Sequence, residues 1–387
     1  MPNLDSLVSF PIPIAGGSAP SSTTASSSRT PIPPATSHIL VTDTLDSPAS
    51  FVLVHFLRAA LSAHRSSSQN AAASATAKGK ARATEKHIVW LGCDASGLGH
   101  WKNLVRRSGV QLDAEISKGR FRHIDAASAL LADHTEDAPS RPGPSAPPPK
   151  GLKTLYDSIA AQLRQIRLQR QQESQAQDRV GDDAGDAQLA WQAETLIVID
   201  DLSALAWSLE TVDSLGRPVD VALHVAKWIR ALRALAAKHK ACLLTLQHAD
   251  ATSVAKTSSS SNTASDAIDE SIFRSLCKTA DVWIEVKELG SGRARDCDGE
   301  ITVHPLVRSS LAPDWTHQSN EDLSEGFEDG TPPLAAFAIE TPCPSRAKAM
   351  LYRIAHDGQT ATSGASGTGT STGRVQLWAR GTGRGFL

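Results

Sequence analysis

The segment HILVTDTLDSPASFVLVHFLRAALSAH, residues 38–64, has the composition of a strand, a turn and a helix. Its first part, HILVTD (38–43), is rich in branched apolar residues, which is typical of a buried strand. The predicted helix follows, with Ser47 as its N-cap and Pro48 at its first position. In a nucleotide-binding α/β protein, a glycine-rich phosphate loop with a lysine would lie between the two elements. The turn here is DTLDSPAS (43–50), which contains neither residue.

The residues of this turn argue against a bound triphosphate. Asp43 and Asp46 add negative charge, and a carboxylate about 4 Å from a phosphate oxygen costs on the order of 4 kcal/mol. Pro48 removes one N–H donor, and Ser47 has no lysine beside it. We interpret Asp46 as a carboxylate that occupies the anion-favouring helix start. We therefore expect a degenerate phosphate-loop position, with no bound cofactor and no catalytic residue.

Two other segments resemble nucleotide motifs without completing them. GCDASGLGH (92–100) has glycines at phosphate-loop spacing, but Leu98 and Gly99 stand where lysine and serine or threonine belong. IVIDD (197–201) resembles the strand-end acid that holds Mg²⁺ in phosphate-loop ATPases, with Asp200 and Asp201 as the acids. An aspartate at a strand end often simply caps the next turn. Without a lysine loop, we expect no metal at this position.

Strand and helix patterns alternate through most of the chain. Buried strands are predicted at 87–94, 121–126, 195–203 and 241–249, and helices at 100–110, 152–171, 219–240 and 267–280. Four later segments, beginning at 281, 299, 349 and 374, alternate with period 2 and have no helices between them. The sequence therefore predicts a three-layer α/β domain with a mainly parallel central sheet and an antiparallel C-terminal meander.

Composition divides the 387 residues into a core and polar segments. We expect a disordered N-terminal tail over 1–36 and a single domain over 37–387. Low-complexity insertions are predicted within that domain, near 66–85, 134–150, 171–190, 251–266, 308–335 and 357–373.

Charge and cysteine usage exclude several classes of protein. The net charge of −2 gives no global basic field for nucleic acid, so any RNA contact needs a local patch or a partner. The five cysteines are scattered without zinc-ligand spacing, which favours a reducing, intracellular setting. No signal peptide is legible, and the longest apolar run is too short to span a bilayer. We expect no membrane association.

Four blocks in the same order resemble the family of fungal sixth subunits of the Elongator complex. They are the strand–turn–helix segment with DTLDSP (43–48), HIVWLGCDASGLGHWKNLVRRSGVQL (87–112), TLIVIDDLSAL (195–205), and AMLYRIAHDG with VQLWARGTGRGFL near the end. The resemblance covers the predicted core and leaves the serine-rich insertions unmatched.

This resemblance implies a RecA-like, phosphate-loop-NTPase-like fold without a functional phosphate loop. It implies a hetero-hexameric ring with the fourth and fifth Elongator subunits, which docks on the larger lobe with its catalytic acetyltransferase subunit. The assembled ring would bind tRNA and support modification of the wobble uridine, in the cytoplasm and in part in the nucleus. Catalysis would reside in another subunit.

Candidate RNA contacts are few. In RecA-like rings, loops at the carboxyl ends of the strands line the centre, here about 202–218 and 250–269, where Arg217 and Lys256 are the basic residues. Lys102, Arg106 and Arg107 form a denser cluster, which also fits a solvated helix face.

Three alternatives remain open from the sequence. The chain could be an active RecA-like ATPase with an unusual loop, supported by IVIDD. It could be a degenerate recombinase paralogue acting in DNA repair, because one fold hosts many functions. It could also be the sibling fifth Elongator subunit, which shares the fold.

Overall fold

A computed structural model describes the larger part of the chain. The described residues are 4–5, 7–11, 29–73, 85–93, 97–133, 150–177, 192–209, 219–249, 264–289, 297–306, 349–355 and 374–379. All structural statements below concern these residues.

A central sheet organises the described part of the molecule, with its nine strands in the order β11-β10-β9-β8-β3-β7-β6-β4-β5. The parallel strands are β3 (His38–Asp43), β4 (His87–Gly92), β5 (Phe121–Asp125), β6 (Thr195–Ile199), β7 (Ala241–His248) and β8 (Val282–Lys287). The antiparallel strands are β9 (Gly299–Pro305), β10 (Met350–Ala355) and β11 (Arg374–Ala379). Strand β8 pairs in parallel with β3 and antiparallel with β9. The predicted antiparallel meander therefore begins at the last parallel strand of the sheet.

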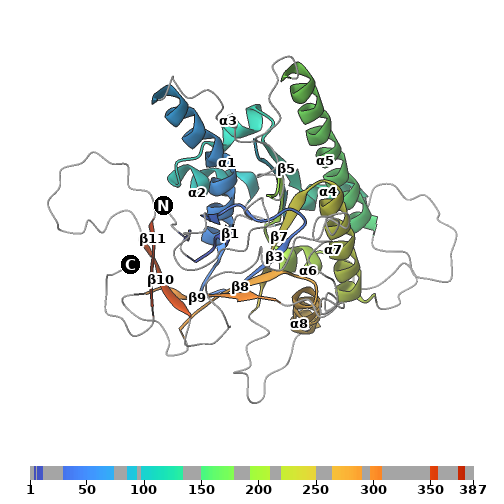
Figure 1. Cartoon of the computed structure of the whole chain (residues 1–387). Helices are drawn as coiled ribbons and strands as arrows, with labels where there is room; N and C mark the ends of the chain where they lie inside the picture. The colour runs from blue at the N-terminus through green and yellow to red at the C-terminus, as the bar shows by residue number, and fades with distance from the viewer. Residues whose placement is uncertain are drawn as a thin grey trace, which may run out of the picture.

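Helices cover both faces of the sheet, and Figure 1 shows the two helical layers on either side of it. One layer contains α1 (Ser50–Ala73), α2 (Gly97–Arg107) and α3 (Leu112–Ser117). The other contains α4 (Ala126–Asp133), α5 (Lys150–Gln177), α6 (Leu202–Trp207), α7 (Val221–Lys238) and α8 (Ala264–Cys277).

Successive side chains along each strand point to opposite faces of the sheet, and each set packs against one of the two helical layers. In β4, Ile88 and Trp90 belong to the core under α1 and α2, whereas Val89 and Leu91 belong to the core under α5 and α7. Strands buried on both faces are therefore nearly continuous apolar runs. The predicted three-layer α/β class, with its mainly parallel sheet and antiparallel C-terminal strands, is confirmed.

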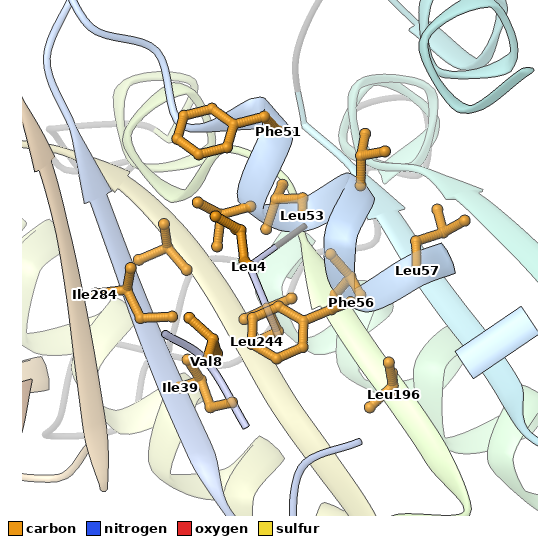
Figure 2. Packing of buried hydrophobic residues seen from close by; sticks show 14 of the residues in the cluster. Leu4, Val8, Ile39, Phe51, Leu53, Phe56, Leu57, Leu196, Leu244 and Ile284 are labelled. Atoms are coloured by element: carbon orange, nitrogen blue, oxygen red, sulfur yellow. The ribbon is translucent and has the colours of Figure 1, made fainter. Parts of the chain in front are cut away.

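The N-terminal segment corrects one prediction. Residues Phe10–Pro11 (β1) pair antiparallel with Arg29–Thr30 (β2), and Leu4 and Val8 are fully buried. Figure 2 shows Leu4 and Val8 between α1 and the sheet. The disordered tail expected over 1–36 is therefore wrong for its described residues, because a few apolar side chains suffice to complete the core under α1.

Some predicted insertions also contain regular structure. Helix α1 extends to Ala73 and α5 to Gln177, while α8 begins at Ala264. Each of these ends lies inside a segment predicted as low-complexity insertion, near 66–85, 171–190 and 251–266. The insertions near 308–335 and 357–373 lie outside the described residues.

Candidate functional site

The carboxyl ends of three adjacent strands meet where a nucleotide would bind in an open α/β sheet. Asp43 is the last residue of β3, and His248 is the last residue of β7. Asp200 and Asp201 directly follow β6. Because β3, β7 and β6 are neighbours in the sheet, these side chains come together although they are far apart in sequence.

His248 joins the two flanking carboxylates. Its Nδ1 lies 2.6 Å from Oδ1 of Asp43, and its Nε2 lies 3.2 Å from Oδ2 of Asp201. Both ring nitrogens can donate to carboxylates only when the imidazole is doubly protonated. Hydrogen bonds with Asp201 and Asp43 raise the pKa of His248 to about 10. At neutral pH, an imidazolium therefore stands between the ends of β3 and β6, and we call Asp43, His248 and Asp201 the edge triad.

Asp43 also closes the start of α1. Its Oδ2 accepts a hydrogen bond of 2.9 Å from the backbone N–H of Ala49, and the residue is only 2 % exposed. The anion-favouring helix end thus carries the protein's own carboxylate, as we expected. The residue that we assigned to this role was wrong, because Asp46 lies exposed on the turn.

The start of α1 lies later than predicted. The helix begins at Ser50, and the backbone N–H of Ser47 donates to the Thr44 carbonyl at 3.0 Å. This tight turn uses the residues that we had placed at the N-cap and first helical position. Pro48 is exposed, whereas Ser47 is buried with its hydroxyl 3.4 Å from the Asp298 carbonyl.

The C-terminal strands hold the other side of the 43–48 turn. The Thr44 hydroxyl donates to Glu288 at 2.7 Å. The rings of Phe51 and Tyr352 lie 4.9 Å apart between centroids. A Cβ on Gly299 would come within 3.0 Å of the Ser47 hydroxyl and 2.9 Å of the Tyr352 ring, so only glycine fits this close approach. The turn is therefore fixed from both sides.

Asp200 accepts three hydrogen bonds from the neighbouring strand and helix. The indole N–H groups of Trp90 and Trp101 donate to its Oδ2 at 2.9 and 3.0 Å, and the backbone N–H of Cys93 donates to its Oδ1 at 2.7 Å. Burial raises its pKa to about 6 despite these donors. Its carboxylate thus joins β4 and α2 to β6.

Asp201 has a different role from Asp200. Its Oδ1 accepts from the backbone N–H of Ala204 at 2.8 Å, which caps α6, and its Oδ2 faces His248. The acid pair that resembled an Mg²⁺ site is therefore engaged by protein groups. Among the described residues, no cluster of His, Cys, Asp or Glu has an arrangement suited to a metal ion.

Trp207 and Asp269 extend the site on the α6 side, and no sequence motif singles them out. The Trp207 indole donates to Asp269 Oδ2 at 3.1 Å and lies 6.3 Å from the His248 ring between centroids. Gln247 donates to the Asp269 carbonyl at 2.9 Å, and burial raises the pKa of the Asp269 carboxyl to about 6. This edge is acidic, with His248 as the cation of the edge triad.

The segments predicted as RNA-facing loops are partly helical. Leu202–Trp207 forms α6, and α8 already begins at Ala264. The basic candidates Arg217 and Lys256 lie outside the described residues. These loops therefore supply no described basic group to the edge.

The second basic cluster lies on α2. Lys102 pairs with Asp113 at 2.6 Å, whereas Arg106 and Arg107 are exposed in the last turn. Since α2 starts just after β4 and runs back along the sheet, its last turn lies away from the edge triad. The structure does not bring these residues together with Asp43, Asp200 or Asp201.

No motif in the sequence singles out His248. A histidine at a strand end carries no signal alone, and its role depends on the strand order that places it between Asp43 and Asp201. The sequence signal that could have identified this site is the acid or histidine at or directly after the end of β3, β6 and β7.

No protein-family model matches the chain, and no curated protein matches it. Among solved structures, it is similar to a KaiC-like protein of the hyperthermophilic archaeon Pyrococcus horikoshii, with 10 % identity and a TM-score of 0.38. That similarity covers 71 % of this chain and 81 % of the other. No helix in the described part of the chain has the length and apolar character needed to cross a membrane.

Proposed function

We propose that this chain is a non-catalytic RecA-like subunit that acts as a scaffold, and that it is the sixth subunit of an Elongator complex. In this proposal, it forms a hetero-hexameric ring with the fourth and fifth subunits. The ring docks on the larger lobe with the acetyltransferase subunit and supports wobble-uridine modification of tRNA. The observation that carries the non-catalytic part is the edge triad.

The contacts of the edge triad support this part of the proposal, because a nucleotide at the carboxyl ends of these strands would need the helix-start donor and a nearby cation. The Ala49 N–H, at the start of α1, donates to Asp43, and the cation between the strand ends is the His248 imidazolium. A triphosphate would have to compete with Asp43 for the Ala49 N–H and for the His248 imidazolium. An Asp43 carboxylate that lost these partners would repel a phosphate oxygen about 4 Å away by about 4 kcal/mol. The turn supplies no lysine in compensation.

The Elongator assignment is supported by the sequence blocks, above all by DTLDSP (43–48) and the segment that ends in SGVQL (108–112). The order of those blocks follows β3, α1, β4, α2, β6 and the C-terminal strands. Each block thus corresponds to a structural unit that builds the sheet or its carboxyl edge.

An active ATPase is the alternative with one specific feature in its favour, the two acids after β6. That reading requires Asp200 and Asp201 to be available for Mg²⁺. Asp200 instead accepts from the Trp90 and Trp101 indoles, and Asp201 caps α6. Among the residues that the structure describes, no feature favours a DNA-repair paralogue or the fifth subunit over this proposal.

Affinity purification of the tagged full chain from its native cells tests the assembly. We expect the fourth and fifth Elongator subunits at near-equal molar amounts, with the larger lobe present at lower salt. Purification without any Elongator subunit would overturn the assignment. Recovery with a recombination complex would support the alternative.

A further inference from the structure

Basic side chains gather at the edge of the sheet opposite to the edge triad. Arg164 and Arg167 on α5, and Lys238 and Lys240 at the end of α7, are exposed. We call these four residues the amino-edge patch. None of them forms an ion pair with a carboxylate in the described part of the chain.

Helix directions place the patch at the amino ends of the strands. Helices α5 and α7 contact one another, and Figure 1 shows them side by side on one face of the sheet. One turn beyond the patch, Arg170 pairs with Glu194 just before β6 and donates to the Glu85 carbonyl just before β4. Lys240 directly precedes β7. The end of α5 and the end of α7 therefore meet at the same edge.

The pKa of His239 indicates a positive electrostatic potential at this edge. Burial is the largest cause that lowers its pKa, and the charges of Arg167, Lys238 and Arg164 lower it further. Three of the four cations thus lie near one imidazole. At the start of β4, burial and then the charge of Arg170, which is not a member of the patch, lower the pKa of His87 to about 4.

Lys240 has an unusual backbone. Its φ is 48°, in the left-handed region that glycine usually occupies after a helix. A lysine at this position costs stability relative to glycine. Its cationic side chain is exposed at the turn between α7 and β7, and it directly follows His239 in the sequence.

We propose that the amino-edge patch binds the phosphate backbone of RNA. This moves the expected RNA contact from the carboxyl-edge loops to the opposite edge of the sheet. The carboxyl edge carries Asp43, Asp201 and Asp269, which repel phosphate, whereas the patch is a local exception in a chain of net charge −2. The charges argue for a phosphate backbone, and the identity of that polymer as RNA, and as tRNA, rests on the proposed function.

The chemistry of the patch favours phosphate over an acidic protein surface. Arginine presents a planar fork of donors that matches phosphate oxygens. Gln165, Gln171 and Gln172 are exposed on the same helix and add amide donors. A protein interface usually has an apolar core. On the described part of α5, Leu168 is the large apolar side chain that is exposed, so this helix offers little apolar surface for such a core.

The test compares two matched pairs of arginines in the full chain. R164Q/R167Q removes two charges from the patch, and R106Q/R107Q removes two exposed charges from α2. The affinity for a fluorescently labelled tRNA transcript is measured by anisotropy at several salt concentrations. The change in net charge is the same for both variants, and circular dichroism verifies that both remain folded.

We expect R164Q/R167Q to weaken binding at least about tenfold and to lower the slope of log K against log salt by about 1.4 to 1.8. R106Q/R107Q should change affinity less than about twofold. Equal losses in both variants, or an unchanged R164Q/R167Q, would overturn the proposal. If R164Q/R167Q instead releases a co-purifying acidic protein and keeps its RNA affinity, the patch is a protein interface and the proposal is wrong.

This result separates the inference from the proposed function. Loss of RNA affinity in R164Q/R167Q without Elongator subunits in the purification would support the patch and reject the Elongator assignment. Co-purification of Elongator subunits together with an unchanged RNA affinity of R164Q/R167Q would support the Elongator assignment and reject the proposed RNA contact at the patch.

Discussion

At the scale of the residue, the protonation of His248 controls the edge triad. Its pKa is raised from 6.5 to about 10 by the hydrogen bonds with Asp201 and Asp43. A basic group with a raised folded-state pKa stabilises the protein fully below pH 6.5, and this contribution is lost as the pH rises through about 10.

We therefore expect the free energy of unfolding to fall by about 1–3 kcal/mol between pH 6.5 and 10, since the partial exposure of the ring reduces the full linkage effect. Urea unfolding of wild type and His248→Gln at several pH values measures this. The variant should lack this alkaline loss, whereas His239→Gln should retain it. An identical pH dependence in wild type and His248→Gln would contradict the triad geometry.

Asp200 gives a second prediction at this scale. Asp200→Asn places an amide –NH₂ against indole or backbone N–H donors, which leaves buried donors without an acceptor. We expect a loss of about 1–3 kcal/mol and a change in tryptophan fluorescence from Trp90 and Trp101. The matched control is Asp125→Asn at the end of β5, where asparagine caps a helix nearly as well as aspartate and the loss should stay below about 0.5 kcal/mol. Equal losses in the two variants would exclude a special role for Asp200.

The sequence predicted that a carboxylate would lie at the start of the helix, but it did not predict which residue provides it. The absence of a lysine and glycine loop and the presence of a capping carboxylate were readable from DTLDSP. The choice of Asp46 instead of Asp43 was wrong, because a tight turn at 44–47 delays the helix start to Ser50. The contribution of His248 requires the spatial order of β3, β7 and β6, which no local pattern contains.

Among the elements, the turn between α7 and β7 allows stability and RNA affinity to be changed independently by substitutions at Lys240. Lys240→Gly should raise the free energy of unfolding by about 1 kcal/mol, because glycine adopts a φ of 48° without the Cβ clash. Lys240→Ala keeps the Cβ and should give no such gain. Chemical denaturation compares the two, and equal stabilities would contradict a strained turn. Both variants should lose RNA affinity to the same extent, because both lack the ammonium group.

The N-terminal segment behaves as part of the core. Phe10 on β1 is fully buried with Leu4 and Val8 under α1. We expect Phe10→Ala to destabilise the protein by about 3–5 kcal/mol. Leu45→Ala is the control, because Leu45 is 80 % exposed and its truncation should cost little. A negligible effect of Phe10→Ala in thermal unfolding would show that this segment does not contribute to the fold.

Long apolar runs made the buried strands β3, β4, β6 and β7 predictable, and helical spacing did the same for α5 and α7. The short helices α3, α4 and α6 were not predicted, since six to eight residues provide little periodicity. The N-terminal strand pair was missed because its few apolar residues adjoin a segment rich in serine and proline. Its burial depends on contacts with α1 that are distant in sequence.

At the scale of the whole molecule, charge is divided between the two edges of the sheet. Carboxylates of Asp43, Asp201 and Asp269 lie at the carboxyl edge, whereas the amino-edge patch is cationic. A net charge of −2 conceals this division. Under the proposed function, the two edges of the described sheet would contact different partners, as in a subunit with unlike surfaces in an assembly.

If the edge triad takes the place of a bound nucleotide, as we propose, the chain should not bind Mg-ATP. Isothermal titration calorimetry of the purified full chain with Mg-ATP measures this binding. We expect no saturable heat at millimolar nucleotide at pH 7, where His248 is protonated. A saturable isotherm that is weakened by substitutions in the 43–50 turn would contradict it.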